Sequence, residues 1–223
     1  HPHLRKLYTG SDGDFFVDLE RGLSSIQNHS SVEEKWNLIL KDGVTYASLG
    51  ADINTLFFYQ FLVSAIGVKT VLEFGTYIGV STLFWAEAVG NDGKVTTVEI
   101  GQEFFDIAAT NIKSNGMDNR VEQKLGPAED VLLDFEKAGR RFDCIFIDAA
   151  KECYDVLFKG ALNCLTDGGV ILVDDVFFQG EILNSNSVSK KALGVQRTLD
   201  LAEKTQGFKS ILPIGNGLLL VRP

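Results

Sequence analysis

The stretch FDCIFIDAAK at residues 142–151, followed by GVILVDD at residues 169–175, decides the fold of this chain. Each segment is a nearly continuous apolar run, as expected of a strand buried on both faces of a parallel sheet. Open α/β sheets bind ligands in the crevice at the carboxyl ends of such strands, which lie about 5 Å apart when they are neighbours. The charged residues at these two ends are Asp148, Lys151, Asp174 and Asp175. We therefore predict a metal site here, or a charge cluster with some other compensation.

The sequence around these runs alternates strand and helix patterns. The predicted strands are residues 71–74, 94–100, 121–125, 142–147 and 170–173, and the predicted helices are residues 80–89, 102–114, 128–138, 155–165 and 191–204. This rhythm predicts an α/β fold with a parallel, doubly wound sheet and right-handed crossovers. Two further strands, 208–214 and 218–221, flank a turn too short for a crossover helix, which predicts a C-terminal antiparallel hairpin.

Length and composition narrow the class of protein. The 223 residues suffice for one large core, so we predict a single domain over 1–223, with an N-terminal helical lid region (1–66) and a binding core (67–223). The net charge of −9 disfavours nucleic-acid binding, and no apolar stretch approaches the roughly 20 residues that span a bilayer. The start of the chain has no apolar run typical of a signal peptide. Three cysteines within predicted strands and helices are expected to be reduced, which favours a cytoplasmic protein.

Residues 71–79, VLEFGTYIG, read as a strand, a glycine-bearing turn and a helix start. Gly75 and Gly79 do not have the spacing of the dinucleotide fingerprint, and Glu73 would repel a pyrophosphate but could order a cradle for a cationic amino-acid group. Glu99, at the end of the second strand, is placed to accept hydrogen bonds from ribose hydroxyls. Either acid alone could be structural, Glu73 by binding backbone amides and Glu99 by capping the next helix. Together with Gly75 they favour a nucleoside cofactor.

Four motifs give these residues a family resemblance. LEFGTYIGVS at residues 72–81 resembles the first motif of the cation-dependent catechol and caffeoyl-CoA O-methyltransferases, FIDAAK at 146–151 and VDD at 173–175 resemble the two later motifs, and LPIGNG at 212–217 resembles the tail. The similarity runs from about Leu49 to Arg222 in the family's order and spacing. It implies a class I methyltransferase sheet, Rossmann-like, with five parallel strands plus the antiparallel hairpin. It also implies S-adenosylmethionine as methyl donor, a divalent cation and a homodimer.

The resemblance implies a role for each matching position. Cofactor contacts would come from Ala51, Glu73, Gly75, Thr76, Ser81, Glu99, Ala128 and Asp148, and metal ligands would be Asp148, Asp174 and Asp175. The methionine part would lie against residues 73–81, the ribose against Glu99, and the adenine against the backbone of Ala128. Ala51 would contact the cofactor from the lid side.

The proposed ligands also indicate the chemistry. All-oxygen ligands suit hard cations such as Mg²⁺, Mn²⁺ or Ca²⁺. In the family the cation is chelated by two vicinal hydroxyls, which implies a small catechol-like substrate whose phenol, with an ordinary pKa of about 10, needs help to ionise. Lys151 would then be the catalytic general base. Asp175 stands where the family usually has Asn, so this site would carry an additional negative charge.

We therefore predict an S-adenosylmethionine- and divalent-metal-dependent O-methyltransferase that methylates one hydroxyl of a catechol-like acceptor. Two alternatives stay open at this point. One is a tRNA hydroxyuridine O-methyltransferase of the same fold, against which the acidic balance argues. The other is a protein that binds S-adenosylmethionine without catalysis.

Overall fold

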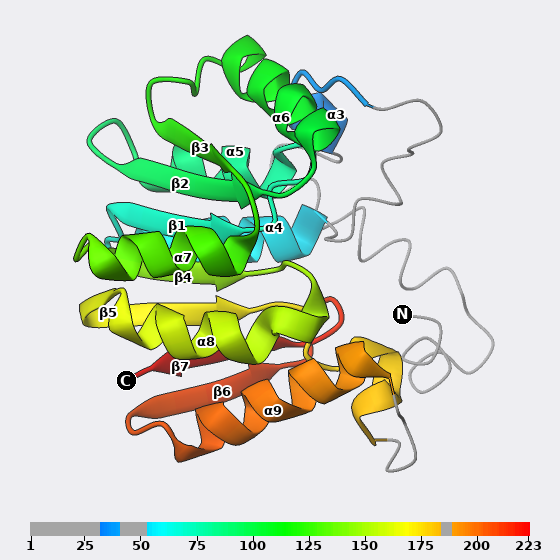
Figure 1. Ribbon diagram of the computed structural model, residues 1–223. Coiled ribbons are helices and arrows are strands. Elements are labelled where there is room, and N and C mark those ends of the chain that lie inside the picture. The colour runs from blue at the N-terminus through cyan, green and yellow to red at the C-terminus, as the bar shows by residue number, and fades with distance from the viewer. Residues whose placement is uncertain (1–31, 41–52, 184–188) are drawn as a thin grey trace.

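The computed structural model describes residues 32–40, 53–183 and 189–223, and one sheet with helices on both faces organises them (Figure 1). Its strands are β1 (Thr70–Phe74), β2 (Lys94–Glu99), β3 (Val121–Leu125), β4 (Phe142–Ile147), β5 (Leu165–Val173), β6 (Phe208–Leu212) and β7 (Leu218–Arg222). The order across the sheet is β3-β2-β1-β4-β5-β7-β6. The first five strands are parallel, and β7 pairs antiparallel with both β5 and β6. The predicted fold is thereby confirmed.

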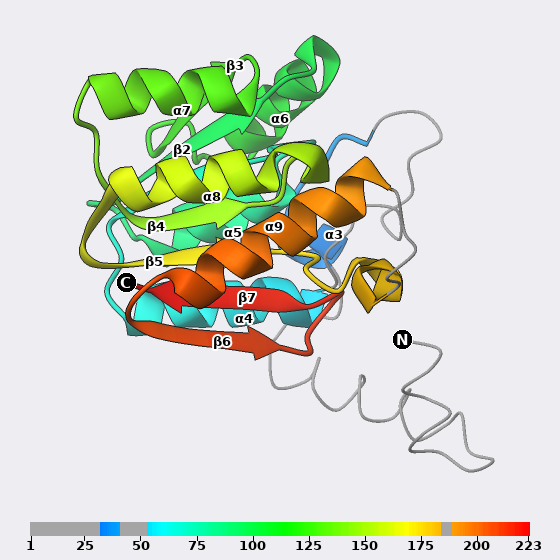
Figure 2. The same ribbon diagram turned by 60° about the horizontal axis from the view of Figure 1, so that its bottom comes forward.

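The helices form two layers. They are α3 (Val32–Lys35), α4 (Ile53–Ala65), α5 (Val80–Ala88), α6 (Gln102–Ser114), α7 (Ala128–Lys137), α8 (Tyr154–Asn163) and α9 (Lys190–Lys204), with short 3₁₀ turns η2 (Lys151–Cys153) and η3 (Phe178–Leu183). Helices α4, α5 and α6 share one apolar core with one face of the sheet, and α7, α8 and α9 share a second core with the other face (Figure 2). None of the described helices is long and apolar enough to cross a membrane.

The central strands are mostly apolar because successive side chains enter different cores. In β4, Cys144 and Phe146 pack toward α4 and α5, whereas Ile145 and Ile147 pack toward α7 and α8. All four side chains are at most 1% exposed. Strands buried on both faces carry nearly continuous apolar runs, and the run at 142–147, interrupted only by Asp143, predicted this strand correctly.

Parallel pairing brings the site residues to one edge of the sheet. Ile147 of β4 is paired with Phe74 of β1 and with Val173 of β5. The residues that follow these three strand ends are Gly75, Asp148 and Asp174, and Glu99 ends β2 at the same edge. The hairpin turn joins them there, because Val176 and Phe177 donate backbone hydrogen bonds to Gly217 (3.0 Å) and Asn216 (2.8 Å).

Some predicted boundaries differ from the structure. The lid region 1–66 is predicted to be helical, but α3 ends at Lys35 and residues 37–40 are not helical. Their backbone is instead bound by the side chains of Asn111 in α6 and of Asn115 at the C-cap of this helix. The predicted helix 155–165 ends earlier, at Asn163, because Leu165 already pairs with Phe142 as the first residue of β5. The predicted lid region 1–66 is described only over residues 32–40 and 53–66.

Candidate active site

A pocket of about 510 Å³ opens at the carboxyl ends of the parallel strands. Its lining includes Gly75, Glu99, Ala128 and Asp148, which the sequence assigned to a cofactor. These residues come from the ends of β1, β2 and β4 and from the start of α7. The volume lies within the range of pockets that enclose small organic ligands.

A second, smaller pocket continues from this one past Gly75 and Asp148. It is lined by Thr76 and Ser81 from the β1–α5 region, and by Asp174 at the end of β5. The structure therefore brings two groups of sequence-assigned residues together, one along the larger pocket and one beside the carboxylates. Ala51, also assigned to the cofactor, lies outside the described residues.

Gly75 is required by the close approach of two strand ends. Its φ is +104°, and a Cβ at this position would lie 2.1 Å from the carbonyl oxygen of Asp148. Any side chain would therefore push β1 and β4 apart and would also strain the backbone. The sequence placed Gly75 in a cofactor-binding turn, and this geometry is compatible with that role. The sequence did not indicate the close approach to Asp148.

Glu99 organises the turn that follows β1. Its Oε2 accepts the N–H of Tyr77 at 2.8 Å, and its Oε1 accepts the N–H of Gly101, the N-cap of α6, at 2.8 Å. The side chain thus fulfils the helix-capping role considered from the sequence. Each carboxylate oxygen has two lone pairs, so these bonds leave acceptor capacity on the pocket side.

Glu73 lies behind the pocket wall. Its side chain is fully buried, and its carboxylate accepts four side-chain hydrogen bonds. The donors are Ser81 (2.6 Å), Thr82, Trp85 (2.9 Å) and Thr97 (2.7 Å). Burial raises the pKa of Glu73, and the four hydrogen bonds oppose that shift. Ser81 borders the smaller pocket and so stands between that pocket and Glu73.

Asp148 and Asp174 occupy adjacent strand ends and repel each other. Desolvation by the surrounding protein, and next the charge of Asp174, raise the pKa of Asp148 well above its usual range, although its side chain reaches solvent through the open pocket. Burial raises the pKa of Asp174 to about 6, although the N–H of Asp175 donates a 2.8 Å hydrogen bond to its Oδ1. Strongly perturbed carboxyls that line a pocket are characteristic of functional sites.

Asp175 and Lys151 complete this charge cluster. The Nζ of Lys151 lies 2.6 Å from Oδ2 of Asp175. The other oxygen, Oδ1, is buried and accepts no hydrogen bond from the described residues. Asp175 also has a positive φ of 56°, which is uncommon outside glycine. Within the described ranges, no three His, Cys, Asp or Glu side chains are arranged so that they could hold a metal ion.

The backbone at Lys151 is fixed by a glycine of the neighbouring helix. A Cβ on Gly194 in α9 would lie 2.0 Å from the carbonyl oxygen of Lys151. Arg197, one turn later, bonds Asp155 through its Nε at 2.6 Å. Helix α9 therefore packs directly on the turn that carries Lys151.

Aromatic residues adjoin the lysine. Its Nζ lies 5.5 Å from the ring centroid of Tyr154 and 5.7 Å from that of Phe178. Tyr154 is buried in the core, yet its hydroxyl lies 3.4 Å from Oδ1 of Asp148. Tyr154 thus belongs both to the apolar core and to the surroundings of the carboxylate cluster.

Sequence reasoning missed several pocket residues. Glu129 and Cys153 line the larger pocket, and Tyr59 lines the smaller one. Tyr59 belongs to a run rich in aromatic residues at 57–61, and it stacks on the buried Trp85 with 5.3 Å between the ring centroids. A tyrosine in such a run could have been suspected of a second role, because its hydroxyl needs a polar environment when buried.

The fold, together with the solved structures that share it, defines the class of protein, that of S-adenosylmethionine-dependent methyltransferases. The solved O-methyltransferase from Bacillus cereus in complex with SAH (S-adenosylhomocysteine) aligns with a TM-score of 0.72 at 25% identity, covering 100% of this chain and 96% of that one. A cofactor-bound protein from M. tuberculosis, Rv0187, aligns with a TM-score of 0.70 at 28% identity, covering 98% and 93%.

The sequence model of the O-methyltransferase family matches residues 24–223, and the chain belongs to this family. It is 27% identical to a probable caffeoyl-CoA O-methyltransferase of Dictyostelium discoideum, over 98% of this chain and 96% of that protein. It is 37% identical to a catechol O-methyltransferase of Mycobacterium tuberculosis, over 68% and 67%. The protein is therefore an S-adenosylmethionine-dependent O-methyltransferase related to those two groups, as predicted from its motifs.

Proposed function

We propose that this enzyme transfers the methyl group of S-adenosylmethionine to one hydroxyl of a small catechol-like acceptor and requires a divalent cation. The observation that carries the proposal is the cluster of Asp148, Asp174 and Asp175 beside the pocket. The single positive charge of Lys151 does not balance these three carboxylates. The names of related proteins, which include catechol and caffeoyl-CoA O-methyltransferases, supply the acceptor class.

In this proposal the methyl donor lies along the larger pocket. Glu99 would accept hydrogen bonds from the ribose with the lone pairs that Tyr77 and Gly101 leave available. The backbone at Ala128 would meet the adenine. Gly75, Thr76 and Ser81 would contact the methionine part, with Glu73 acting through its hydrogen bond from Ser81. Asp148 would hold the donor's amino group, because it borders both pockets.

The carboxylates fit a hard cation by their donor chemistry. Asp148, Asp174 and Asp175 offer oxygens only, as Mg²⁺, Mn²⁺ and Ca²⁺ prefer. The buried Oδ1 of Asp175 without a hydrogen-bond partner among the described residues, and the mutual repulsion of Asp148 and Asp174, are both features that a cation would relieve. A bound cation would supply positive charge that favours the ionised form of the acceptor hydroxyl. In this structure the three side chains are not gathered around one ion position, so binding would require them to turn toward a shared cation. On their donor chemistry, the three residues are proposed as its ligands.

Lys151 is proposed as the base that accepts the proton of that hydroxyl. Its Nζ stands at the carboxylate cluster and within 6 Å of two aromatic rings, so an aromatic acceptor lying there would be within its reach. To accept a proton, the amine must be neutral and must separate from Asp175. The remaining contribution of the protein is to align the acceptor oxygen with the methyl group for in-line displacement.

The test is turnover of a catechol panel by the full-length protein, followed by mass spectrometry. We expect methylated product with S-adenosylmethionine, loss of product in EDTA, and recovery when Mg²⁺ or Mn²⁺ is added in excess. Unchanged turnover in EDTA would exclude the cation.

Two controls separate the alternatives. Calorimetric binding of SAH without product from any vicinal diol would favour a non-catalytic binding protein. Affinity for tRNA that falls steeply with salt would favour a nucleic-acid substrate. A homodimer, which the family resemblance implies, is checked independently by light scattering.

A further inference from the structure

Asn111 of α6 uses its whole side-chain amide to join two separate segments. Its Oδ1 accepts the N–H of Ile39 at 2.6 Å, and its Nδ2 donates to the carbonyl of Ile39 at 3.1 Å. The second hydrogen of Nδ2 goes to the carbonyl of Ile78 at 2.9 Å. The residue is fully buried. Because two carbonyls face the nitrogen and one N–H faces the oxygen, only one orientation of the amide satisfies all three contacts.

The Ile78 carbonyl belongs to the glycine-bearing turn after β1. Tyr77 before it has a φ of 49°, and Gly79 after it has a φ of 87°. A non-glycine residue in this conformation persists only when its surroundings enforce it. Glu99 holds the turn through the Tyr77 N–H, at the pocket. Asn111 holds it through the Ile78 carbonyl, from α6.

The other partner of Asn111 is the non-helical segment 37–40. One turn further along α6, Asn115 binds the same segment in the same manner: its Oδ1 accepts the N–H of Asn37 at 2.9 Å, and its Nδ2 donates to the carbonyl of Asn37 at 2.8 Å. Its Nδ2 also donates to the carbonyl of Asn111, one turn earlier in α6. The two asparagines therefore share the segment, whereas the bond to the turn belongs to Asn111.

We propose that Asn111 is a positioning residue for the methyl donor, and that it couples cofactor binding to the docking of residues 37–40. The proposal rests on the placement of the donor over the Gly75–Gly79 turn given above. If one side chain holds both the turn and the segment, ordering of either one reduces the freedom of the other. By linkage, SAH binding and docking of the segment must then favour each other equally.

The experiment compares Asn111→Ala with Asn115→Ala in the full chain, by calorimetric titration with SAH. We expect the dissociation constant to rise about fivefold or more in Asn111→Ala, the lower end of usual coupling strengths. The change in Asn115→Ala is expected to stay within about twofold, because that residue has no bond to the turn. Hydrogen exchange supplies a second measurement: SAH should slow exchange of the Ile39 amide in the wild type and not in Asn111→Ala.

The outcomes are distinguishable. Equal SAH affinity in wild type and Asn111→Ala, with only a lower melting temperature, would leave Asn111 a purely structural role and overturn the proposal. Equal losses in both variants would overturn it too, since segment docking alone would then explain them. Failure of the wild type to bind SAH would instead reject the placement of the donor. If Asn111→Ala does not fold, Asn111→Ser, which can still donate one hydrogen bond, replaces it in the same comparison.

Discussion

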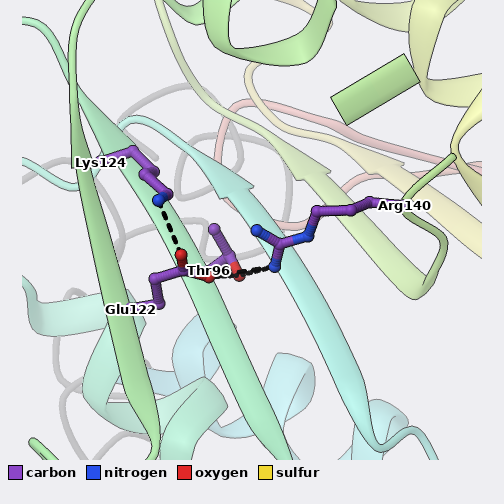
Figure 3. A network of polar contacts seen from close by, with 4 residues as sticks. All are labelled: Thr96, Glu122, Lys124 and Arg140. Atoms are coloured by element: carbon purple, nitrogen blue, oxygen red, sulfur yellow. Dashed lines mark hydrogen bonds and ion pairs between the residues drawn. The ribbon is translucent and has the colours of Figure 1, made fainter. Parts of the chain in front are cut away.

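At the β3 edge of the sheet the carboxylate of Glu122 has a cation on each oxygen, whereas at the carboxyl ends of β4 and β5 several carboxylates share one lysine. Lys124 lies 2.7 Å from one oxygen of Glu122 and Arg140 lies 3.0 Å from the other, with Thr96 beside them (Figure 3). Partial burial would raise the pKa of Glu122, but hydrogen bonds from Lys124 and Arg140 lower it to about 2.

In the crevice at the carboxyl ends of β4 and β5, negative charges outnumber positive ones. There the pKa of Asp148 and that of Asp174 are raised, and one oxygen of Asp175 has no hydrogen-bond partner among the described residues. The same chemical group is thus stabilised by its neighbours in one region and destabilised by them in the other. Under the proposed function, the charges at Glu122 support the fold, whereas the charges of the crevice would be balanced only by a bound cation.

The largest effect that tests this contrast is expected from Asp174→Asn. We predict a loss of at least about 100-fold in kcat/KM, more than is typical when only a supporting residue of a metal site is changed. The free energy of unfolding should stay the same or increase, because one of three repelling charges is removed. Steady-state kinetics and urea unfolding at pH 7 measure both. A variant that loses stability along with activity would show that the cluster supports the fold instead.

Lys151→Met should have the next largest effect. Loss of a general base typically costs about 10²-fold or more, so kcat should fall by that factor while SAH affinity, measured by calorimetry, stays near the wild-type value. Lys159→Met, an exposed lysine of the following helix, is the matched control and should keep full activity. A wild-type kcat in Lys151→Met would remove this residue from the chemistry.

Asp175→Asn addresses the added charge of this site. The amide keeps one oxygen donor but removes a negative charge, so we expect kcat to change by less than about tenfold and the Mg²⁺ concentration for half-maximal rate to increase. Metal titrations of activity measure this shift. A lower Mg²⁺ requirement would mean that the third carboxylate hinders the cation.

Glu122→Gln is expected to have the smallest effect. Unlike the substitutions in the crevice, it should change stability and not activity. Activity should be unchanged, and the free energy of unfolding should fall by less than about 1 kcal/mol, because the pair is partly exposed and screened by solvent. The pKa of Glu122 is lower in the folded state, so its contribution is present above the ordinary value of 4.5 and disappears as the pH falls toward about 2. Unfolding of both proteins between pH 5 and pH 2 should therefore converge.

Much of the fold could be predicted because its signals are local. The strands β1 and β4 are each interrupted by a single acidic residue, and the hairpin turn leaves no length for a crossover helix. The start of β5 was missed, because Asp167 and Gly168 interrupt the apolar run although the strand already begins at Leu165. Residues 37–40 were assigned to a helix, because apolar spacing does not reveal that distant asparagines bind their backbone.

The candidate site was predictable only in part for a similar reason. The strand-end positions of Asp148 and Asp174 follow from the topology, so their proximity could be derived. The surroundings of Glu73 could not, because one of its donors, Thr97, comes from the next strand and the others from a helix face. The ion pair of Lys151 with Asp175 depends on side-chain directions that spacing does not specify.

The contact between Gly194 and the Lys151 carbonyl has a consequence for anyone who wishes to make this enzyme more heat-resistant. Replacing a glycine in a helix interior by alanine is a standard stabilising change, worth about 1 kcal/mol when the position is free. At Gly194 the new methyl group would occupy the place of a backbone oxygen and displace the turn that carries Lys151. A propensity-guided redesign would therefore select a substitution here that improves the helix and damages the enzyme.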